Sequence, residues 1–188
     1  VSTKSESWQN EQYLAINTDI NYPAPEIVGE IENQNLHSLS NIDFVIIVPS
    51  NGILLSQAQR LADAHTKKEG MKCFVVTADK VYNEFSSGTP DATAYRRFMK
   101  MLYDKAETEE EAPKNLLLFG DGLWDNRMIT TSMRRKSQDD YLLCYESDES
   151  VSTTESYVLE EYFALLDDGE GDDVLKDKPD IGYGRIPV

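Results

Sequence analysis

The 188-residue sequence has few of the side chains that most often form nucleophilic sites: it contains two histidines and two cysteines. His37 lies in an irregular polar segment, and His65 lies on the apolar stripe of a predicted helix. Cys73 and Cys144 each stand inside a short apolar stretch, and no CxxC spacing occurs. Because a cysteine nucleophile needs a base beside it, we expect both thiols to pack as small core residues and predict no catalytic residue in this chain.

Other common binding motifs are absent as well. No G-x-x-x-x-G-K-[ST] or G-x-G-x-x-G sequence follows a strand-like stretch, and no G-x-S-x-G elbow is present. Positive charge is scarce, because 18 Lys and Arg face 34 Asp and Glu and the net charge is −16. Such a chain repels phosphate backbones and anionic lipid, so we expect no nucleic-acid partner. The longest apolar runs have only the length of strands, so we expect no membrane span.

The sequence does contain an alternation of apolar strands and amphipathic helices. The strand-like runs are "DFVIIVP", "KCFVVTAD" and "NLLLFGD", and helical spacing occurs in residues 54–70 and 89–106. We expect Gly70 to end the first helix, and Thr89 to cap the second with Pro90 in its first turn. The apolar face of the second helix is predicted to contain Tyr95, Phe98, Met99, Leu102, Tyr103 and Ala106. Buried strands separated by helices predict an α/β fold, a parallel sheet with helices on both faces.

Both ends of the sequence depart from this pattern. Residues 1–41 are polar and irregular, so we expect an extended N-terminal arm in which "EQYLAINT" could form one edge strand. No Met or apolar leader precedes the first residue, so we expect the sequence to start inside a longer or processed precursor. Residues 128–147 suggest a β excursion or hairpin, residues 157–168 a short amphipathic helix or turn, and residues 179–188 a further strand.

Carboxylates are the one chemical group in excess. Thirteen acids lie between Glu146 and Asp180 against two lysines, and "LLDDGEGDD" gathers five of them around two glycines. Acids this close repel one another unless they are solvated or bridged by a cation. An EF-hand is excluded, because that loop requires glycine where Asp173 stands and a distal Glu where Pro179 stands. An exposed acidic turn and a cation site both remain open.

Five longer strings, in this order, resemble the gingipain family of cysteine peptidases. They are "ENQNLHSLSNIDFVIIVP", "QAQRLADAH", "VYNEFSSGTPDATAYRRFMKMLYDKA", "NLLLFGDGLWDNR" and "YFALLDDGEGDD" followed by "DIGYGRIPV". The resemblance runs from about Ile27 to Val188. It is greatest to those members that act as sortases of the type IX secretion system in Bacteroidetes.

The resemblance implies a caspase-like (flavodoxin-like) fold in which two α/β subdomains lie side by side and the second carries the catalytic His and Cys. Residues 42–188 would then be the first, non-catalytic subdomain, truncated before the catalytic one, and residues 1–41 a run-in from a preceding domain. The implied partners are the downstream catalytic subdomain, protein substrates with C-terminal sorting domains, and other secretion-system proteins. The implied location is the cell surface, on the outer membrane, or the periplasm.

The resemblance also implies a structural Ca²⁺ ion held by the carboxylates of Asp121, Asp168 and Asp180 and by backbone carbonyls. The carbonyls belong to Leu166 and Lys178, and Asp167, Glu170 or Asp172 could replace Asp168. Two other functions stay open at this stage. One is a calcium-dependent interaction module without peptidase activity. The other is a receiver-like switch at Asp79 or Asp121, which the lack of paired acids after the first strand weakens.

Overall fold

The computed structural model describes residues 14–27, 29–147, 154, 156–171 and 176–188. The chain divides into two units, residues 1–33 and 34–188. In the first unit, the described residues form no helix or strand, and Leu14 and Ile16 are 90% and 61% exposed. The predicted edge strand is therefore wrong for residues 14–18, because a strand without a neighbour has no partners for its backbone groups; residues 11–13 lie outside the described part.

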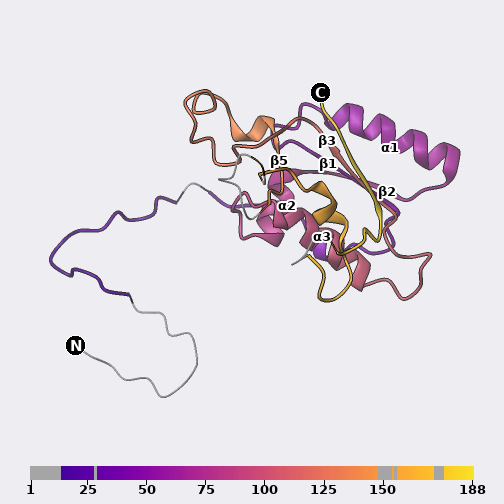
Figure 1. Ribbon diagram of the computed structural model, residues 1–188, viewed down its shortest axis with the longest axis horizontal. Coiled ribbons are helices and arrows are strands. Elements are labelled where there is room, and N and C mark those ends of the chain that lie inside the picture. The colour runs from indigo at the N-terminus through magenta and orange to yellow at the C-terminus, as the bar shows by residue number, and fades with distance from the viewer. Residues whose placement is uncertain (1–13, 28, 148–153, 155, 172–175) are drawn as a thin grey trace, which may run out of the picture. The chain divides into compact units, whose positions relative to one another are not determined.

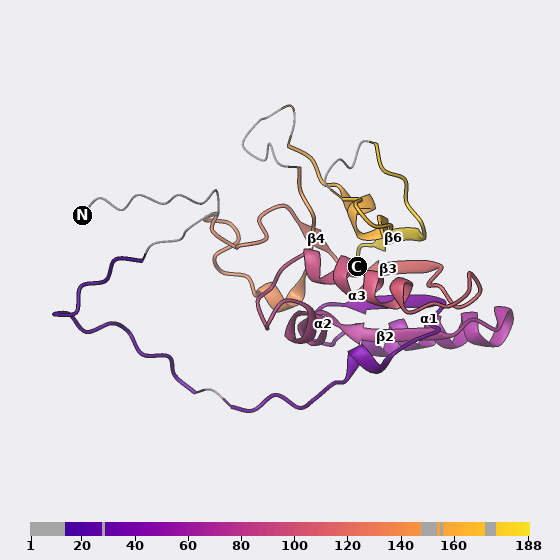
Figure 2. The same cartoon turned by 90° about the horizontal axis from the view of Figure 1, so that it is seen from below.

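The second unit is built on a four-stranded parallel sheet in the order β2-β1-β3-β6 (Figure 1). The strands are β1 (Phe44–Val48), β2 (Cys73–Thr77), β3 (Asn115–Phe119) and β6 (Gly182–Ile186). Every residue of β1 is buried, as expected of a central parallel strand covered on both faces. In Figure 2, β6, β3 and β2 follow one another from top to bottom, with β6 at one end of the sheet. The three strands predicted from apolar runs and the further strand predicted in residues 179–188 are confirmed.

Helices cover both faces of the sheet. On one face, α1 (Leu55–Glu69) buries Ala58 and Ala62 against Phe44, Ile46 and Leu117. It ends at Gly70, as predicted, and the φ of 72° at Gly70 is the left-handed geometry common at helix ends. The other face carries α2 (Ala78–Phe85) and α3 (Thr93–Asp104). The α/β fold with helices on both faces is confirmed.

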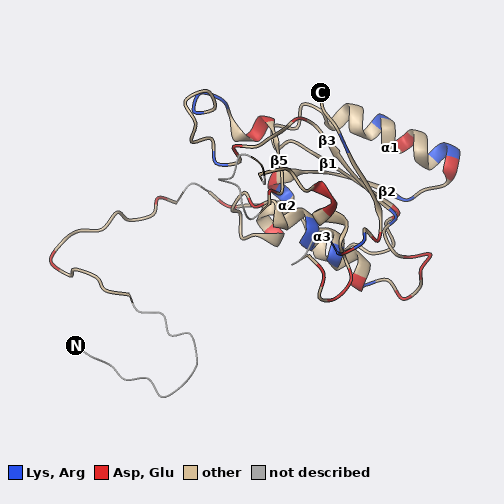
Figure 3. Ribbon diagram, in the orientation of Figure 1, with Lys and Arg blue, Asp and Glu red and all other residues tan. Residues whose placement is uncertain are grey.

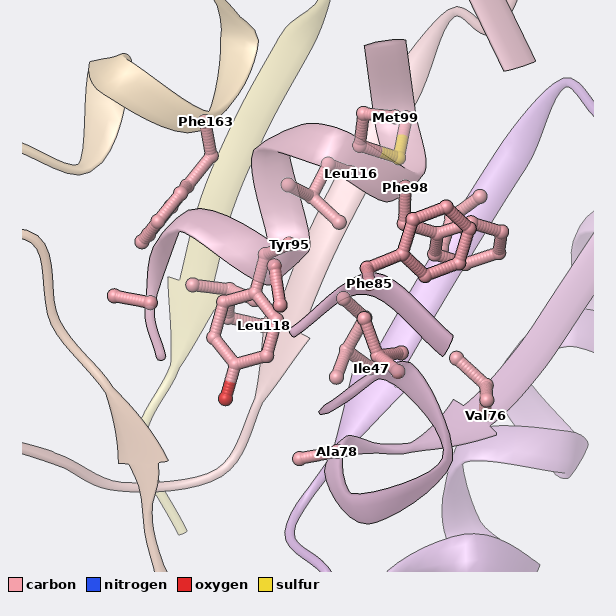
Figure 4. Packing of buried hydrophobic residues seen from close by; sticks show 14 of the residues in the cluster. Ile47, Val76, Ala78, Phe85, Tyr95, Phe98, Met99, Leu116, Leu118 and Phe163 are labelled. Carbon is pink, nitrogen blue, oxygen red and sulfur yellow. The ribbon is translucent and has the colours of Figure 1, made fainter. Parts of the chain in front are cut away.

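The core on the α2–α3 face is rich in aromatic rings (Figure 4). Phe98 is fully buried, and its ring centroid lies 5.2 Å from that of Phe85 and 6.3 Å from that of Phe74. Tyr95 is also fully buried, and its hydroxyl group hydrogen-bonds that of Tyr82. Aromatic pairs of this kind stabilise a core beyond the apolar area that they bury. Helix α3 is thereby fixed against both α2 and the sheet.

The start of α3 differs from the prediction. The helix begins at Thr93, after Thr89 and Pro90, because the carboxylate of Asp91 accepts the Thr93 N–H at 2.9 Å and takes the capping role expected of Thr89. The predicted apolar face is confirmed for its buried members, whereas Tyr103 and Ala106 are only half-buried.

The excursion after β3 is not a hairpin. Strands β4 (Gly122–Leu123) and β5 (Leu142–Leu143) pair in parallel, and parallel strands need a long connection. The last part of this connection is the 3₁₀ helix η2 (Gln138–Asp140). The predicted short helix near residue 160 is the 3₁₀ helix η3 (Glu160–Ala164), and a further one, η1 (Leu36–Ser38), packs near α2. Among the residues with a described position, none of the helices has the length and apolar character needed to span a bilayer.

Candidate functional site

The carboxyl ends of the strands converge on Arg185 of β6. Its Nε donates to Glu160 Oε1 at 2.6 Å, and its terminal nitrogens donate to the backbone carbonyls of Gly120 and Leu143 at 3.3 and 3.1 Å. A terminal nitrogen also forms an ion pair with Glu160. The two side chains are only 12% and 19% exposed. One guanidinium group therefore ties together β6, η3, β5 and the end of β3.

Two glycines make room for this arrangement. A Cβ atom on Gly122 would lie 2.7 Å from the sulfur of Cys144 and 2.9 Å from the guanidinium carbon of Arg185. A Cβ atom on Gly120 would lie 2.7 Å from the ring of Pro49, and the φ of 155° at Gly120 is one that other residues rarely adopt. The Gly-Asp-Gly sequence thus lets the end of β3 approach its neighbours closely.

Cys144 is part of the same cluster and is not activated as a nucleophile. Its sulfur lies 3.7 Å from an Arg185 nitrogen and 3.8 Å from a Glu160 oxygen. Burial raises the pKa of the Cys144 thiol, which favours the unreactive protonated form. The other cysteine, Cys73, lies in β2 with its sulfur 3.8 Å from the carbonyl of Met71.

The two histidines have acidic partners of their own. His37 Nδ1 lies 2.7 Å from a carboxylate oxygen of Glu84, and its ring stacks on Phe85. His65 Nδ1 lies 3.0 Å from a carboxylate oxygen of Glu69. Within the described residues, neither histidine hydrogen-bonds a cysteine, so this arrangement contains no Cys–His pair ready for proton transfer.

Asp121, which the family resemblance predicts as a calcium ligand, hydrogen-bonds backbone N–H groups. Its carboxylate accepts the N–H of Val188 at 3.1 Å, and its carbonyl accepts the N–H of Leu142 at 2.8 Å. Asp121 therefore links the segment after β6 and the start of β5 to the end of β3.

Asp180, another predicted carboxylate ligand of calcium, lies at the opposite end of strand β6. Its carboxylate accepts the N–H groups of Leu166 and Asp167 at 2.6 and 3.2 Å. Asp180 stands just before Gly182, the first residue of β6, whereas Asp121 contacts Val188 beyond its last. About 20 Å of strand separates these ends, and two ligands of one Ca²⁺ lie within roughly 5 Å of each other. Asp121 and Asp180 therefore do not share an ion in this structure.

The acids of the intervening loop also have protein partners. Asp168 forms an ion pair with Lys100 at 2.8 Å, and Asp167 accepts a hydrogen bond from the Tyr103 hydroxyl at 2.8 Å. Lys178 is exposed, Leu166 is fully buried, and Asp172 lies outside the described residues. No group of three His, Cys, Asp or Glu residues suited to a metal occurs in the described part of the chain. The structure thus does not bring the five predicted ligands together, and a Ca²⁺ ion bound by this chain stays a prediction.

The hydrogen bonds of Asp180 predict a modest, local role. Replacing Asp180 with Ala removes the acceptor for two N–H groups, and we expect a loss of about 1 kcal/mol because the site is exposed to water. For a chain of this size, the melting temperature should fall by about 2–4 °C. Asp180→Asn keeps one acceptor oxygen and should lose less. Thermal melts of the three proteins test this order, and equal losses for Ala and Asn would contradict it.

Glu146 is the acid whose protein environment opposes its charge. Burial, with the nearby carboxylate of Asp125, raises the pKa of Glu146 above its ordinary value of 4.5. The Glu146 Oε1 atom is buried and has no hydrogen-bond partner among the described residues. Asp125 keeps its own charge, because hydrogen bonds from Thr130 lower the pKa of Asp125 despite burial. Ionising Glu146 therefore costs stability in the folded state.

This difference predicts a pH-dependent effect of Glu146→Gln. Since the pKa of Glu146 is raised on folding, its penalty is absent below pH 4.5 and grows as the pH rises through the folded-state value. We expect the Glu146→Gln variant to have a higher melting temperature than the wild type near neutral pH and the same melting temperature below pH 4.5. Melts followed by circular dichroism at both pH values would show this, with the exposed Glu109→Gln as the matched control. The same gain at both pH values would refute the charge explanation.

Comparison with known proteins gives a family match and a structural match. The sequence profile of Peptidase family C25 matches residues 37–188. The structure is similar to the crystal structure of dimeric latent PorU from Porphyromonas gingivalis, with 41% sequence identity and a TM-score of 0.74. That alignment covers 88% of this chain and 16% of the PorU chain, so this chain spans a small part of its relative. The search of curated proteins returned no match.

Proposed function

Because the chain belongs to Peptidase family C25, the gingipain family, we propose that it forms the first, non-catalytic α/β subdomain of a cysteine peptidase. The observation that carries this proposal is the PorU match, which aligns most of this chain with 16% of a much longer one. The parallel sheet flanked by helices agrees with the caspase-like fold predicted from the sequence. In the whole protein, a second subdomain following residue 188 would supply the thiolate and the histidine.

The chemistry of the described cysteines supports this division of roles. Cys144 is buried beside the Arg185–Glu160 ion pair and has a raised pKa, and Cys73 lies within a strand. Thiolate attack needs a lowered pKa and an accessible sulfur. We therefore assign Cys144 a packing role in which it fills the space beside Gly122 and supports the end of β3.

A peptidase assay on the full-length protein and on the 188-residue chain tests the proposal. We expect the full-length protein to cleave a peptide substrate and to be blocked by a thiol-alkylating reagent, and the short chain to cleave nothing. Cys73→Ala and Cys144→Ala in the full-length protein should keep the activity, provided that their melts show a folded protein. Cleavage by the short chain, or loss of activity in a folded Cys144→Ala variant, would overturn the assignment.

For the whole protein, we propose the narrower role of a sortase that processes secreted proteins at the cell surface or in the periplasm. The support is the 41% sequence identity with PorU and the resemblance of the long sequence strings to type IX secretion sortases. Its proposed partners are protein substrates with C-terminal sorting domains and other secretion-system proteins. The alternative of a calcium-dependent interaction module lacks support from the candidate site, because Asp121 and Asp180 lie at opposite ends of strand β6.

A further inference from the structure

A groove of about 450 Å³ lies beside α3, bounded by the end of α2 and by η1. Its lining combines positive and apolar side chains, and we call it the basic groove after its main members, Arg96, Arg97, Lys100, Lys105, Phe85 and Met101. Figure 3 shows Lys and Arg gathered on α3. In a chain of net charge −16, four cations with one lining carboxylate, that of Asp104, form a local reversal of charge.

Neighbouring acids cancel only part of the positive charge of this groove. Arg96 donates to the backbone carbonyls of Leu165 and Glu170 at 2.6 and 2.8 Å, and Lys105 donates to two backbone carbonyls in and next to η1. Carbonyl groups satisfy the N–H donors and leave the net charge in place. Among the residues with described positions, no carboxylate lies within 4.0 Å of the charged groups of Arg96 or Lys105.

Arg97 adds an exposed cation whose acidic partner lies at the limit of ion-pair distance. Its side chain is 55% exposed, it donates to the carbonyl of Phe85 at 2.9 Å, and its nearest carboxylate, on Asp91, is 4.0 Å away. Lys100 differs, since it forms close ion pairs with Asp104 and with the acidic loop at Asp168. Arg97 and Lys105 are therefore the cations best placed to meet an incoming anion.

The spacing along α3 defines the anion that fits. Arg97 and Met101 in α3 and Lys105 at its C-cap follow one another at four-residue intervals, so they share one side of the helix. The Cα atoms of Arg97 and Lys105 are about 12 Å apart along the helix axis, with Met101 between them. In an extended peptide, side chains at positions i, i+2 and i+4 point the same way, and the outer two are about 13 Å apart. The exposed ring of His37, which stacks on the buried ring of Phe85, adds a flat surface beside Met101.

We propose that the basic groove binds an extended acidic peptide segment of a partner protein, with a carboxylate two residues before and two residues after an apolar side chain. The carboxylates would pair with Arg97 and Lys105, and the apolar side chain would rest on Met101 and on the exposed His37 ring that stacks on Phe85. The negative charge of the rest of the chain repels long polyanions such as nucleic acids. This inference does not depend on the peptidase assignment.

Fluorescence anisotropy with the 188-residue chain tests the groove. The probe is a fluorescein-labelled peptide of the pattern Glu-x-Phe-x-Glu, and the matched peptide carries Gln in place of both Glu residues. We expect saturable binding of the acidic peptide and at least tenfold weaker binding of the Gln peptide, since two charge-assisted hydrogen bonds are lost. Arg97→Gln/Lys105→Gln should weaken the acidic peptide by a similar factor.

The control removes the same charge from another part of the surface. Lys67 and Lys68, exposed at the end of α1, serve for this purpose, and Lys67→Gln/Lys68→Gln should leave the affinity unchanged. Because Lys105 also holds η1, Arg97→Gln alone is the fallback if the double variant melts early, and it should still lose several-fold in affinity. Absent binding, equal binding of the Gln peptide, or equal losses in both double variants would overturn the proposal. A polyphosphate competitor is compared with unlabelled acidic peptide at equal concentrations of negative charge. If polyphosphate displaces the labelled peptide more effectively, the proposal is overturned in favour of a general polyanion site.

Discussion

Replacing Arg185 with Met is expected to destabilise the chain by about 3–5 kcal/mol, because it leaves the half-buried carboxylate of Glu160 without its cation. The substitution also removes donors from the carbonyls of Gly120 and Leu143. Urea denaturation followed by circular dichroism gives the free energy of unfolding directly. A loss below about 1 kcal/mol would mean that water replaces the guanidinium group without cost.

The double variant Arg185→Met/Glu160→Leu separates the ion pair from the packing around it. When both charges are replaced by apolar side chains, no buried charge is left unpaired, and much of the lost stability should return. Arg185→Lys keeps the charge but loses the planar group that bonds several partners at once, so its stability should lie between that of the wild type and that of Met. Additive losses in the double variant would show that the two side chains act independently.

Truncating Phe98 to Ala is expected to cost about 3–5 kcal/mol, comparable with the loss at Arg185. Phe98 is fully buried on α3 between Phe74 and Phe85, so the removed ring leaves a cavity lined by rings that the backbone holds in place. The melting temperature should fall by about 6–20 °C. Phe98→Leu fills most of the space and should lose less than half as much, and equal losses would show that the specific ring contacts dominate over volume.

The central strands of the sheet were predictable from the sequence, because a strand buried on both faces has a continuous run of apolar residues, as β1 does. Helix α2 was missed because it starts at Ala78, directly after β2, with no loop to mark its start. Likewise, Asp91 replaced Thr89 as the capping group, a choice that depends on local backbone geometry. Element identity follows from periodicity, whereas element boundaries depend on contacts that the sequence does not display.

The candidate site was harder to predict, for a different reason. The many acids near the C-terminal end of the chain predicted a bound cation. In the structure, Lys100, Tyr103 and backbone N–H groups are the partners of Asp168, Asp167 and Asp180. Arg185 and Glu160, the residues that join the strand ends, were overlooked. The available signal was a lone arginine in a Gly-rich strand, which in a buried position requires a carboxylate partner. Which carboxylate it finds, 25 residues away in the chain, depends on the tertiary fold.

The position of β6 in the sheet also bears on how the chain folds during synthesis. The first three strands and their helices form a continuous stretch, whereas Gly182 of β6 pairs with Asn115 of β3, 67 residues earlier. Pairing across so long an interval of sequence is slow, and it cannot begin until β6 has emerged from the ribosome. Until then, β3 has an open edge of unpaired backbone groups, the kind of surface that a chaperone or a neighbouring nascent chain can engage.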